Sequence, residues 1–283
     1  MTRFSIAGLQ MALPNADNRE RIAQEVAATM ARFPWVQMVM LPELATFGPA
    51  LARAEPLPGE TEQHYQGLAR KHGIWLLTGS LYERVGERVC NTASVIDPEG
   101  KVVTRYRKIF PFLPYEQGVT PGAEAVVFDV PDVGRFGLSI CYDGWFPETT
   151  RALAWQGAEV ILHPTMTGTI DRAQELVIAQ ANAIMNQCYF IDINNAGALG
   201  NGRSILVGPE GDVLHQAGEQ AEVIPVTLDL ERVRETRANG LKGLGQVLKS
   251  FRDTPVAFPF YAQGAVSAPL QALGPLRLPR RPA

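Results

Sequence analysis

Two kinds of hydrophobic pattern alternate along the chain. Short apolar runs rich in β-branched residues, such as residues 36–41, are typical of buried strands. Longer segments place an apolar side chain at every third or fourth position, as residues 18–33 do with Ile22, Val26 and Met30, and this period is typical of helices. We therefore expect strands at 4–11, 36–41, 74–82, 89–97, 101–106, 125–130, 136–140, 159–163, 188–194, 204–208, 213–215 and 223–228, and helices at 18–33, 60–72, 147–157, 171–186, 229–238 and 241–251.

Segments with glycine and proline separate several of the predicted strands. Pro98-Glu99-Gly100 and Pro209-Glu210-Gly211 predict hairpin turns, and residues 131–134 predict a third turn. Helices that alternate with strands, combined with hairpins, predict an α/β fold with one mixed sheet or two and with helices outside. We expect one globular domain over residues 1–263. The tail at 264–283 has four prolines and no periodicity, so we expect an extended arm there.

Composition narrows the class of protein. The 283 residues are 46% hydrophobic and 19% charged, which is typical of a globular chain with a sizeable core. A net charge of −3 gives no reason to expect a nucleic acid or an anionic membrane as a partner. Cys90, Cys141 and Cys188 are too few and too widely spaced for a disulfide framework or a zinc site. Because the sequence shows neither a signal peptide nor a membrane-length apolar stretch, we expect a cytoplasmic protein.

The histidines and glycines match no cofactor motif. His64 and His72 lie too far apart on one predicted helix to share a metal ion at ideal spacing. The segment 197–202 has the wrong glycine order for a dinucleotide-binding turn, and neither a Walker A motif nor a serine nucleophile elbow occurs. We therefore expect no metal ion and no nucleotide-binding motif.

Residues 136–148 carry the strongest sign of chemistry. An apolar run ends on Cys141, and a polar turn that contains Gly144 and Pro147 opens the next predicted helix. A thiol at such a turn is partly exposed and faces backbone N–H groups, which favour a thiolate and can bind an oxyanion. A buried structural cysteine is the alternative, and the segment alone does not decide between the two interpretations.

Three charged residues lie beside apolar, strand-like sequence. Glu43 follows the predicted strand at 36–41, at the end where ligands bind in α/β folds. Lys108 precedes the apolar segment 109–114, and a buried ammonium requires a carboxylate partner. Only five of the 26 basic residues are lysines, so a lysine here suggests a compact charge or a movable proton. Glu116 follows in the same region. A solvated loop position is the alternative for both glutamates.

Three segments together resemble a known family. Leu41-Pro42-Glu43, Tyr106-Arg107-Lys108 and the run Gly-Leu-Ser-Ile-Cys-Tyr-Asp-Gly-Trp-Phe-Pro-Glu at 137–148 resemble, in order and spacing, the signature segments of the nitrilase superfamily of carbon–nitrogen hydrolases. The resemblance covers residues 3–230. It implies a four-layer αββα sandwich of mixed sheets with outer helices, a dimer or larger assembly, and no cofactor. The segment from Tyr106 to Glu116 resembles the amidase branch in particular.

The resemblance also implies a role for each candidate residue. Cys141 would attack the carbonyl carbon of an amide and form a thioester. Glu43 would act as general base and then as general acid, while Lys108 and the backbone N–H of Tyr142 would stabilise the oxyanion. Glu116 would orient the amide nitrogen. Four further residues are expected to bind the substrate: Tyr115, Trp145, His163 and Thr165.

The predicted activity is that of an amidohydrolase that releases ammonia or an amine from a small carboxamide. The sequence Cys141-Tyr142-Asp143 resembles the nucleophile segment of amidases. True nitrilases carry Cys-Trp-Glu at this point. An N-carbamoyl hydrolase is an alternative, and Arg172 is the candidate clamp for its substrate carboxylate. A catalytically silent interaction module is a second alternative, against which the intact candidate residues argue. Leu44, where aliphatic amidases usually carry an aromatic residue, and the segment 163–167 leave the acyl group undefined.

Overall fold

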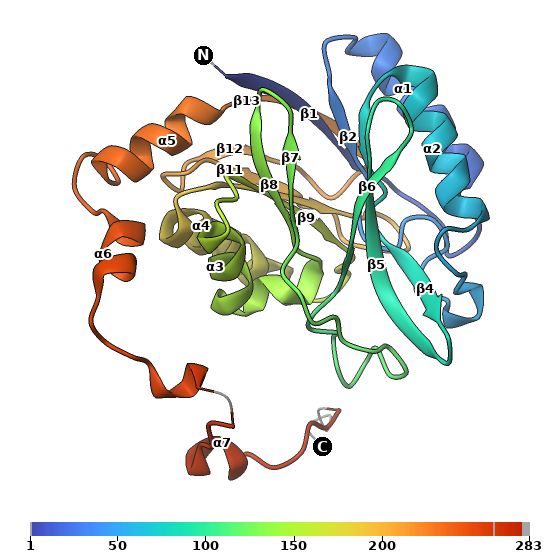
Figure 1. Ribbon diagram of the computed structural model, residues 1–283. Coiled ribbons are helices and arrows are strands. Elements are labelled where there is room, and N and C mark those ends of the chain that lie inside the picture. The colour runs from blue at the N-terminus through green and yellow to red at the C-terminus, as the bar shows by residue number, and fades with distance from the viewer. Residues whose placement is uncertain (1, 263, 279–283) are drawn as a thin grey trace.

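The computed structural model describes residues 2–262 and 264–278. Two β-sheets lie face to face, and helices cover the outer face of each sheet, so the chain forms four layers in the order α, β, β, α (Figure 1). The predicted αββα sandwich is therefore confirmed.

The first sheet joins the two ends of the domain. Its strands run in the order β13-β1-β2-β3-β5-β4, with β6 also paired to β5, and the antiparallel β1–β13 pair brings Arg3 opposite Asp229. Helices α1 (Arg19–Arg32) and α2 (Glu60–His72) pack on its outer face. The strands are β1 (Arg3–Gln10), β2 (Met38–Met40), β3 (Trp75–Leu77), β4 (Leu81–Val85), β5 (Arg88–Ile96), β6 (Val102–Arg107) and β13 (Glu222–Asp229).

The second sheet runs in the order β12-β11-β10-β9-β8-β7. Helices α3 (Pro147–Trp155) and α4 (Arg172–Asn186) cover it, and α5 (Leu230–Asn239), α6 (Val247–Asp253) and α7 (Ala268–Gln271) follow the last strand. Its strands are β7 (Val127–Val130), β8 (Gly134–Leu138), β9 (Val160–Thr165), β10 (Tyr189–Asn194), β11 (Ile205–Val207) and β12 (Val213–Gln216).

Successive side chains of a strand point in opposite directions, one toward the other sheet and the next toward the outer helices. On β1, Phe4 and Ile6 pack in the core between the sheets, whereas Ala7 and Leu9 pack against the α1 and α2 layer. Burial on both faces explains why such strands read as continuous apolar runs. The sheets approach closely at Gly8, where a Cβ would collide with the side chain of Ile193 on β10.

Two element predictions were wrong in detail. Residues 74–82 form two strands, because Gly79 has a φ of +69° and turns the chain between β3 and β4. Residues 240–246 form turns at Gly240 and Gly243, so the predicted 241–251 helix begins only at Val247. The predicted extended tail contains the short helix α7, and its last five positions, 279–283, lie outside the described residues. Within the described ranges, no helix is long and apolar enough to span a membrane.

Candidate active site

Four of the predicted site residues meet where strands of both sheets end. Glu43 lies in the turn after β2 and Lys108 directly after β6, both on the first sheet. Glu116 lies in the loop that follows Lys108. Cys141 follows β8 of the second sheet and begins a short 3₁₀ helix, Cys141–Trp145.

Lys108 is the centre of the cluster. Its Nζ donates to Oε1 of Glu43 at 2.9 Å and to Oε2 of Glu116 at 2.7 Å. Lys108 and Glu43 are both buried, so water does not screen this ion pair. The backbone N–H of Phe112 donates to the same Glu116 oxygen at 2.6 Å, which fixes that carboxylate against its own loop.

Asn91 is a site residue that the sequence prediction missed. Its Nδ2 donates to Oε1 of Glu43 at 2.8 Å and to Oε1 of Glu116 at 3.3 Å, so one amide holds both carboxylates. Asn91 lies on β5 and is fully buried. A lone amide inside a buried strand needs hydrogen-bond partners, and that requirement was the available sign.

The backbone around Glu43 is held from both sheets. Asn195, from the second sheet's side, donates from Nδ2 to the Glu43 carbonyl at 2.7 Å, and the N–H of Leu44 donates to Oγ of Ser80 at 3.1 Å. Leu44 has a φ of +51°, a left-handed conformation that is unusual for leucine. These contacts fix the direction in which the Glu43 side chain leaves the turn.

Asp143 ties the cysteine turn to the lysine segment. Its carboxylate accepts hydrogen bonds from the N–H of Ile140 at 2.9 Å, the N–H of Phe110 at 2.8 Å and the hydroxyl of Tyr106 at 2.7 Å. Because Tyr106 and Phe110 flank Lys108, this one carboxylate sets the position of the lysine relative to Cys141. Cys141 itself has a φ of +47°, and such strained conformations persist only where the surroundings enforce them.

The electrostatics of the cluster favour a neutral thiol. Burial and the Glu43 carboxylate raise the pKa of Cys141 well above its usual value, although Lys108 acts in the other direction. Burial also raises the pKa of Glu43. Burial alone would lower the pKa of Lys108, but the carboxylates of Glu43 and Glu116 outweigh it and raise this pKa well above its usual value. The favoured resting state is therefore the protonated thiol, which agrees with the expected role of Glu43 as the general base that removes its proton.

Aromatic side chains surround the cysteine turn. Tyr142 packs against Phe112 with ring centroids 4.8 Å apart and meets Phe146 edge-on at 5.2 Å. Tyr115 stacks on Phe112 and remains 55% exposed. The indole Nε1 of Trp145 points to Oε1 of Glu175 at 3.5 Å. Substrate contact by Tyr115, Tyr142 and Trp145 stays a prediction.

His163 lies beneath the turn. Its Nδ1 is 2.9 Å from Oγ of Ser139, and a Cβ added to Gly144 would touch its ring. Burial lowers the pKa of His163 to about 4, so the ring is neutral. Thr165 ends the same strand and is also buried. These contacts are with the protein itself, and binding of substrate by His163 and Thr165 stays a prediction.

A buried ion cluster is linked to Cys141 through Thr167. Oγ1 of Thr167 is 3.8 Å from the cysteine Sγ and donates to Oε1 of Glu175 at 3.1 Å. Arg172 donates to Glu175 at 3.0 Å and to both oxygens of Asp192 at 2.8 and 3.0 Å. The Arg172 guanidinium is thus fully buried and committed to two carboxylates.

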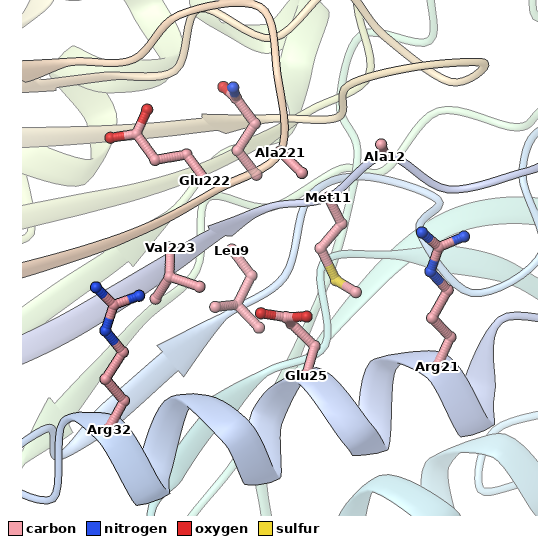
Figure 2. Close-up of a pocket in the computed structure, with 10 residues that line it drawn as sticks. Leu9, Met11, Ala12, Arg21, Glu25, Arg32, Ala221, Glu222 and Val223 are labelled. Atoms are coloured by element: carbon pink, nitrogen blue, oxygen red, sulfur yellow. The ribbon is translucent and has the colours of Figure 1, made fainter.

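A second cavity lies away from this cluster. A groove of about 420 Å³ lies between α1 and the β1–β13 edge, where Arg21, Glu25 and Arg32 face Glu222 and Val223 (Figure 2). Its lining includes none of the four clustered residues. In the parts of the chain that the structure describes, no group of three or more histidine, cysteine or acidic residues is arranged to hold a metal ion.

A model of the carbon–nitrogen hydrolase family matches residues 5–238. The chain belongs to this family. As a member of this family it hydrolyses carbon–nitrogen bonds other than peptide bonds. Its similarity to amidases assigns it to the amidase-like branch of the nitrilase superfamily, which confirms the prediction from the three signature segments.

Two relatives and one solved structure illustrate the similarity. Human omega-amidase NIT2 is 29% identical over 262 residues, which cover 84% of this chain and 92% of that protein. The 2-oxoglutaramate amidase of Bacillus subtilis is 29% identical over 247 residues, covering 83% and 94%. An amidase from Nesterenkonia aligns with a TM-score of 0.74 and 27% identity over 83% of this chain and 94% of that one. In that structure the acetamide moiety of fluoroacetamide is covalently attached to the active-site cysteine.

Proposed function

We propose that this carbon–nitrogen hydrolase is an amidase that converts a small carboxamide to a carboxylate and ammonia through a thioester on Cys141. The observation that carries the proposal is the position of Lys108, whose ammonium is bonded to Glu43 and Glu116 beside the thiol. The proposal assigns to this group of residues a base, a cationic oxyanion donor and a nucleophile that act around one point.

The first half of the reaction forms the thioester. Glu43 takes the thiol proton as Sγ of Cys141 bonds to the amide carbon, and the carbonyl oxygen becomes an oxyanion. Lys108 and the backbone N–H of Tyr142 stabilise that charge, and each such donor is typically worth about 2.7–4 kcal/mol of barrier. Glu43 then gives its proton to the leaving nitrogen, the C–N bond breaks and ammonia departs.

The second half releases the acid. Glu43, ionised again, removes a proton from water as the water oxygen attacks the thioester carbon. The oxyanion forms at the same two donors, the C–S bond breaks, and the proton on Glu43 returns to the sulfur. Each turnover consumes one water molecule and restores the neutral thiol that the resting pKa shifts favour.

Other residues of the site would bind and orient the substrate. Glu116 would accept a hydrogen bond from the substrate's amide nitrogen while keeping Lys108 charged. Tyr115, Trp145, His163 and Thr165 would shape the pocket, as the resemblance implies. The relatives named above act on omega-amides and 2-oxoglutaramate, so amides of this kind are the first substrates to test.

The position of Arg172 argues against the alternative activity, that of an N-carbamoyl hydrolase. A clamp for a substrate carboxylate needs a guanidinium that faces the pocket, but Arg172 is buried and bonded to Glu175 and Asp192. The discriminating experiment measures ammonia release from 2-oxoglutaramate, simple aliphatic amides, nitriles and ureido acids. We expect turnover of an amide and none of the nitriles or ureido acids. Turnover confined to ureido acids would contradict the proposal.

Replacement of the nucleophile tests the mechanism directly. Cys141→Ala should abolish ammonia release with the fold retained, because no other side chain can form the thioester. Cys90→Ala and Cys188→Ala are the matched controls: both cysteines are free and buried, and both variants should stay active. Substantial hydrolysis by Cys141→Ala would exclude the thioester mechanism.

The proposal also covers the setting in which the enzyme works. Three free cysteines suit a reducing compartment, and we infer a cytoplasmic enzyme. We further infer a single catalytic domain over residues 1–263 and a homodimer or larger assembly. The exposed apolar side chains of α3 and α4 support self-association.

A further inference from the structure

Thr167 touches the nucleophile and has no task in the mechanism proposed above. It lies in the loop between β9 and α4, is buried, and places Oγ1 3.8 Å from Sγ of Cys141. That separation suits a hydrogen bond involving sulfur. The contact comes from the β9–α4 loop, whereas Glu43 and Lys108 reach the cysteine from the first sheet.

The backbone of Thr167 is fixed on both of its polar groups. Its N–H donates to Oδ1 of Asn194 at 2.8 Å, and Nδ2 of Asn194 donates back to its carbonyl at 2.9 Å. Asn194 is fully buried at the end of β10, and its own N–H donates to Ser204 at 2.9 Å. Thr167 is therefore anchored to the second sheet and not only to its loop.

The hydroxyl of Thr167 is also oriented. It donates its single hydrogen to Oε1 of Glu175 at 3.1 Å, and Arg172 holds the other oxygen of that carboxylate at 3.0 Å. Arg172 is fixed in turn by Asp192. With its hydrogen used in this way, the hydroxyl has only lone pairs left to face Cys141, so it can accept a hydrogen bond from a thiol but cannot donate one to a thiolate.

We propose that Thr167 and Glu175 are positioning residues that hold Cys141 as a protonated thiol until substrate is bound. The proposal rests on the amidase function above. The thiol has one hydrogen and two acceptors, Glu43 and Thr167. Both can accept this hydrogen at rest, and in the reaction it passes to Glu43 as the C–S bond forms. The Thr167 hydrogen stays on Glu175 throughout.

The charges around the sulfur agree with this assignment. Glu43 and Lys108 face it from the first sheet and Glu175 faces it from α4, and the charge of Glu175 adds to the rise in the pKa of Cys141. The neutral His163 contacts the backbone of the turn from beneath. A thiolate would thus meet carboxylates on two sides and one ammonium. Without the Thr167 contact and the Glu175 charge, the free thiol should ionise more readily.

The test measures alkylation of Cys141 by iodoacetamide across pH, followed by mass spectrometry. Glu175→Gln keeps an acceptor for Thr167 but removes the charge, so we expect the midpoint of the profile to fall by about one pH unit, which corresponds to a rise of about tenfold in rate near neutral pH. Thr167→Val should also speed alkylation and should lower kcat with little change in KM. Thr167→Ser should restore both values, because it keeps the hydroxyl.

The same alkylation assay provides a control variant and the results that would contradict the proposal. Thr169→Val, two positions along the loop with an exposed side chain, should keep the wild-type profile. Glu175→Gln leaves Arg172 paired with Asp192, so a circular dichroism melt should show a folded protein. Wild-type alkylation profiles for both Thr167→Val and Glu175→Gln would overturn the proposal, as would a Thr167→Ser variant that behaves like Thr167→Val. Alkylation requires no amide turnover, so these results are independent of whether the protein proves to be an amidase.

Discussion

At the scale of single residues, the two carboxylates that hold Lys108 differ in their other partners. Glu43 reaches the thiol, whereas Glu116 accepts a second hydrogen bond from the N–H of Phe112 at 2.6 Å. Glu43 is thus placed to move a proton, and Glu116 is placed to keep a charge and a loop in position. The same residue type serves two purposes because different elements supply its neighbours.

Glu116→Gln tests this division. The amide is nearly isosteric but carries no charge, so Lys108 and the substrate nitrogen lose a charge-assisted hydrogen bond of roughly 1.5–3 kcal/mol. We expect kcat to fall roughly 10- to 100-fold, while iodoacetamide still alkylates Cys141 because Glu43 remains. A variant that hydrolyses its best amide at the wild-type rate would reduce Glu116 to a structural residue of its loop.

His163 should make stability depend on pH. Its pKa is lowered from 6.5 to about 4 by burial, so between these values the unfolded chain binds a proton that the folded chain does not. The contribution of neutral His163 to the free energy of unfolding is therefore fully present above pH 6.5. It is lost as the pH falls toward 4, at about 1.4 kcal/mol per pH unit and about 3 kcal/mol in all. His163→Gln should show a shallower loss of stability over this range in urea titrations. Parallel profiles for the two proteins would contradict the prediction.

Single positions were predictable from the sequence where the residue lies at or just beyond the end of a strand. Lys108 directly follows β6, and Glu43 and Cys141 lie in the turns after β2 and β8. Strand ends meet at one edge in this kind of fold. Asn91 and Asp143 were not identified as structural partners, because what they do depends on residues far along the chain: Asn91 holds Glu43 from 48 positions away. Such pairings depend on how the sheets pack, and no local sequence pattern predicts them.

At the scale of elements, the turn between β3 and β4 supports the turn that carries Glu43. Gly79 has a φ of +69°, and a Cβ there would collide with the carbonyl of Pro42. Gly79→Ala should therefore push Pro42 aside, displace Glu43 and lower both stability and kcat. Its matched control is Gly73→Ala, at a φ of +62° with open space around it.

In Gly73→Ala the new methyl group meets no neighbour, so the only cost is the strain of a left-handed conformation. We expect this variant to lose about 1–2 kcal/mol of stability and to keep its kcat. Gly79→Ala should lose clearly more stability and also lose activity. Equal stability losses and equal kcat values in the two variants would show that crowding of Pro42 has no effect. Urea unfolding and ammonia release measure the two quantities.

The same turn shows where prediction of elements failed. Residues 74–82 read as one strand because apolar side chains lie on both sides of Thr78-Gly79-Ser80, and a single glycine between them was weak evidence for a break. Residues 241–251 read as one helix because the pattern does not show that Gly240 and Gly243 have positive φ values. In both cases the backbone conformation of glycine outweighed the hydrophobic period.

At the scale of the whole molecule, an apolar surface remains uncovered on the second helix layer. Trp155 of α3 is 65% exposed, although its ring meets Phe251 of α6 at 5.9 Å, and Val177 and Met185 of α4 are exposed as well. Trp155 therefore does not fill the core. A patch of this kind on a monomer usually marks an interface.

We expect the protein to self-associate through this surface. Light scattering at micromolar concentration should give a multiple of the 30.9 kDa chain mass. Trp155→Glu should shift the mass toward that of one chain, because a carboxylate would be buried without a partner. Trp35→Glu, at an exposed tryptophan before β2, should leave the mass unchanged. A wild-type mass of one chain would remove the prediction.

The pairing of β1 with β13 has a consequence for when the catalytic site forms during synthesis. The first sheet needs residues 222–229 to flank β1, and Cys141 meets Glu43 and Lys108 only when the two sheets are packed. A chain emerging from the ribosome thus carries an ordinary cysteine until nearly the whole sandwich has been made. A truncated or half-folded copy therefore has a thiol without its general base and oxyanion donor, and it cannot hydrolyse an amide.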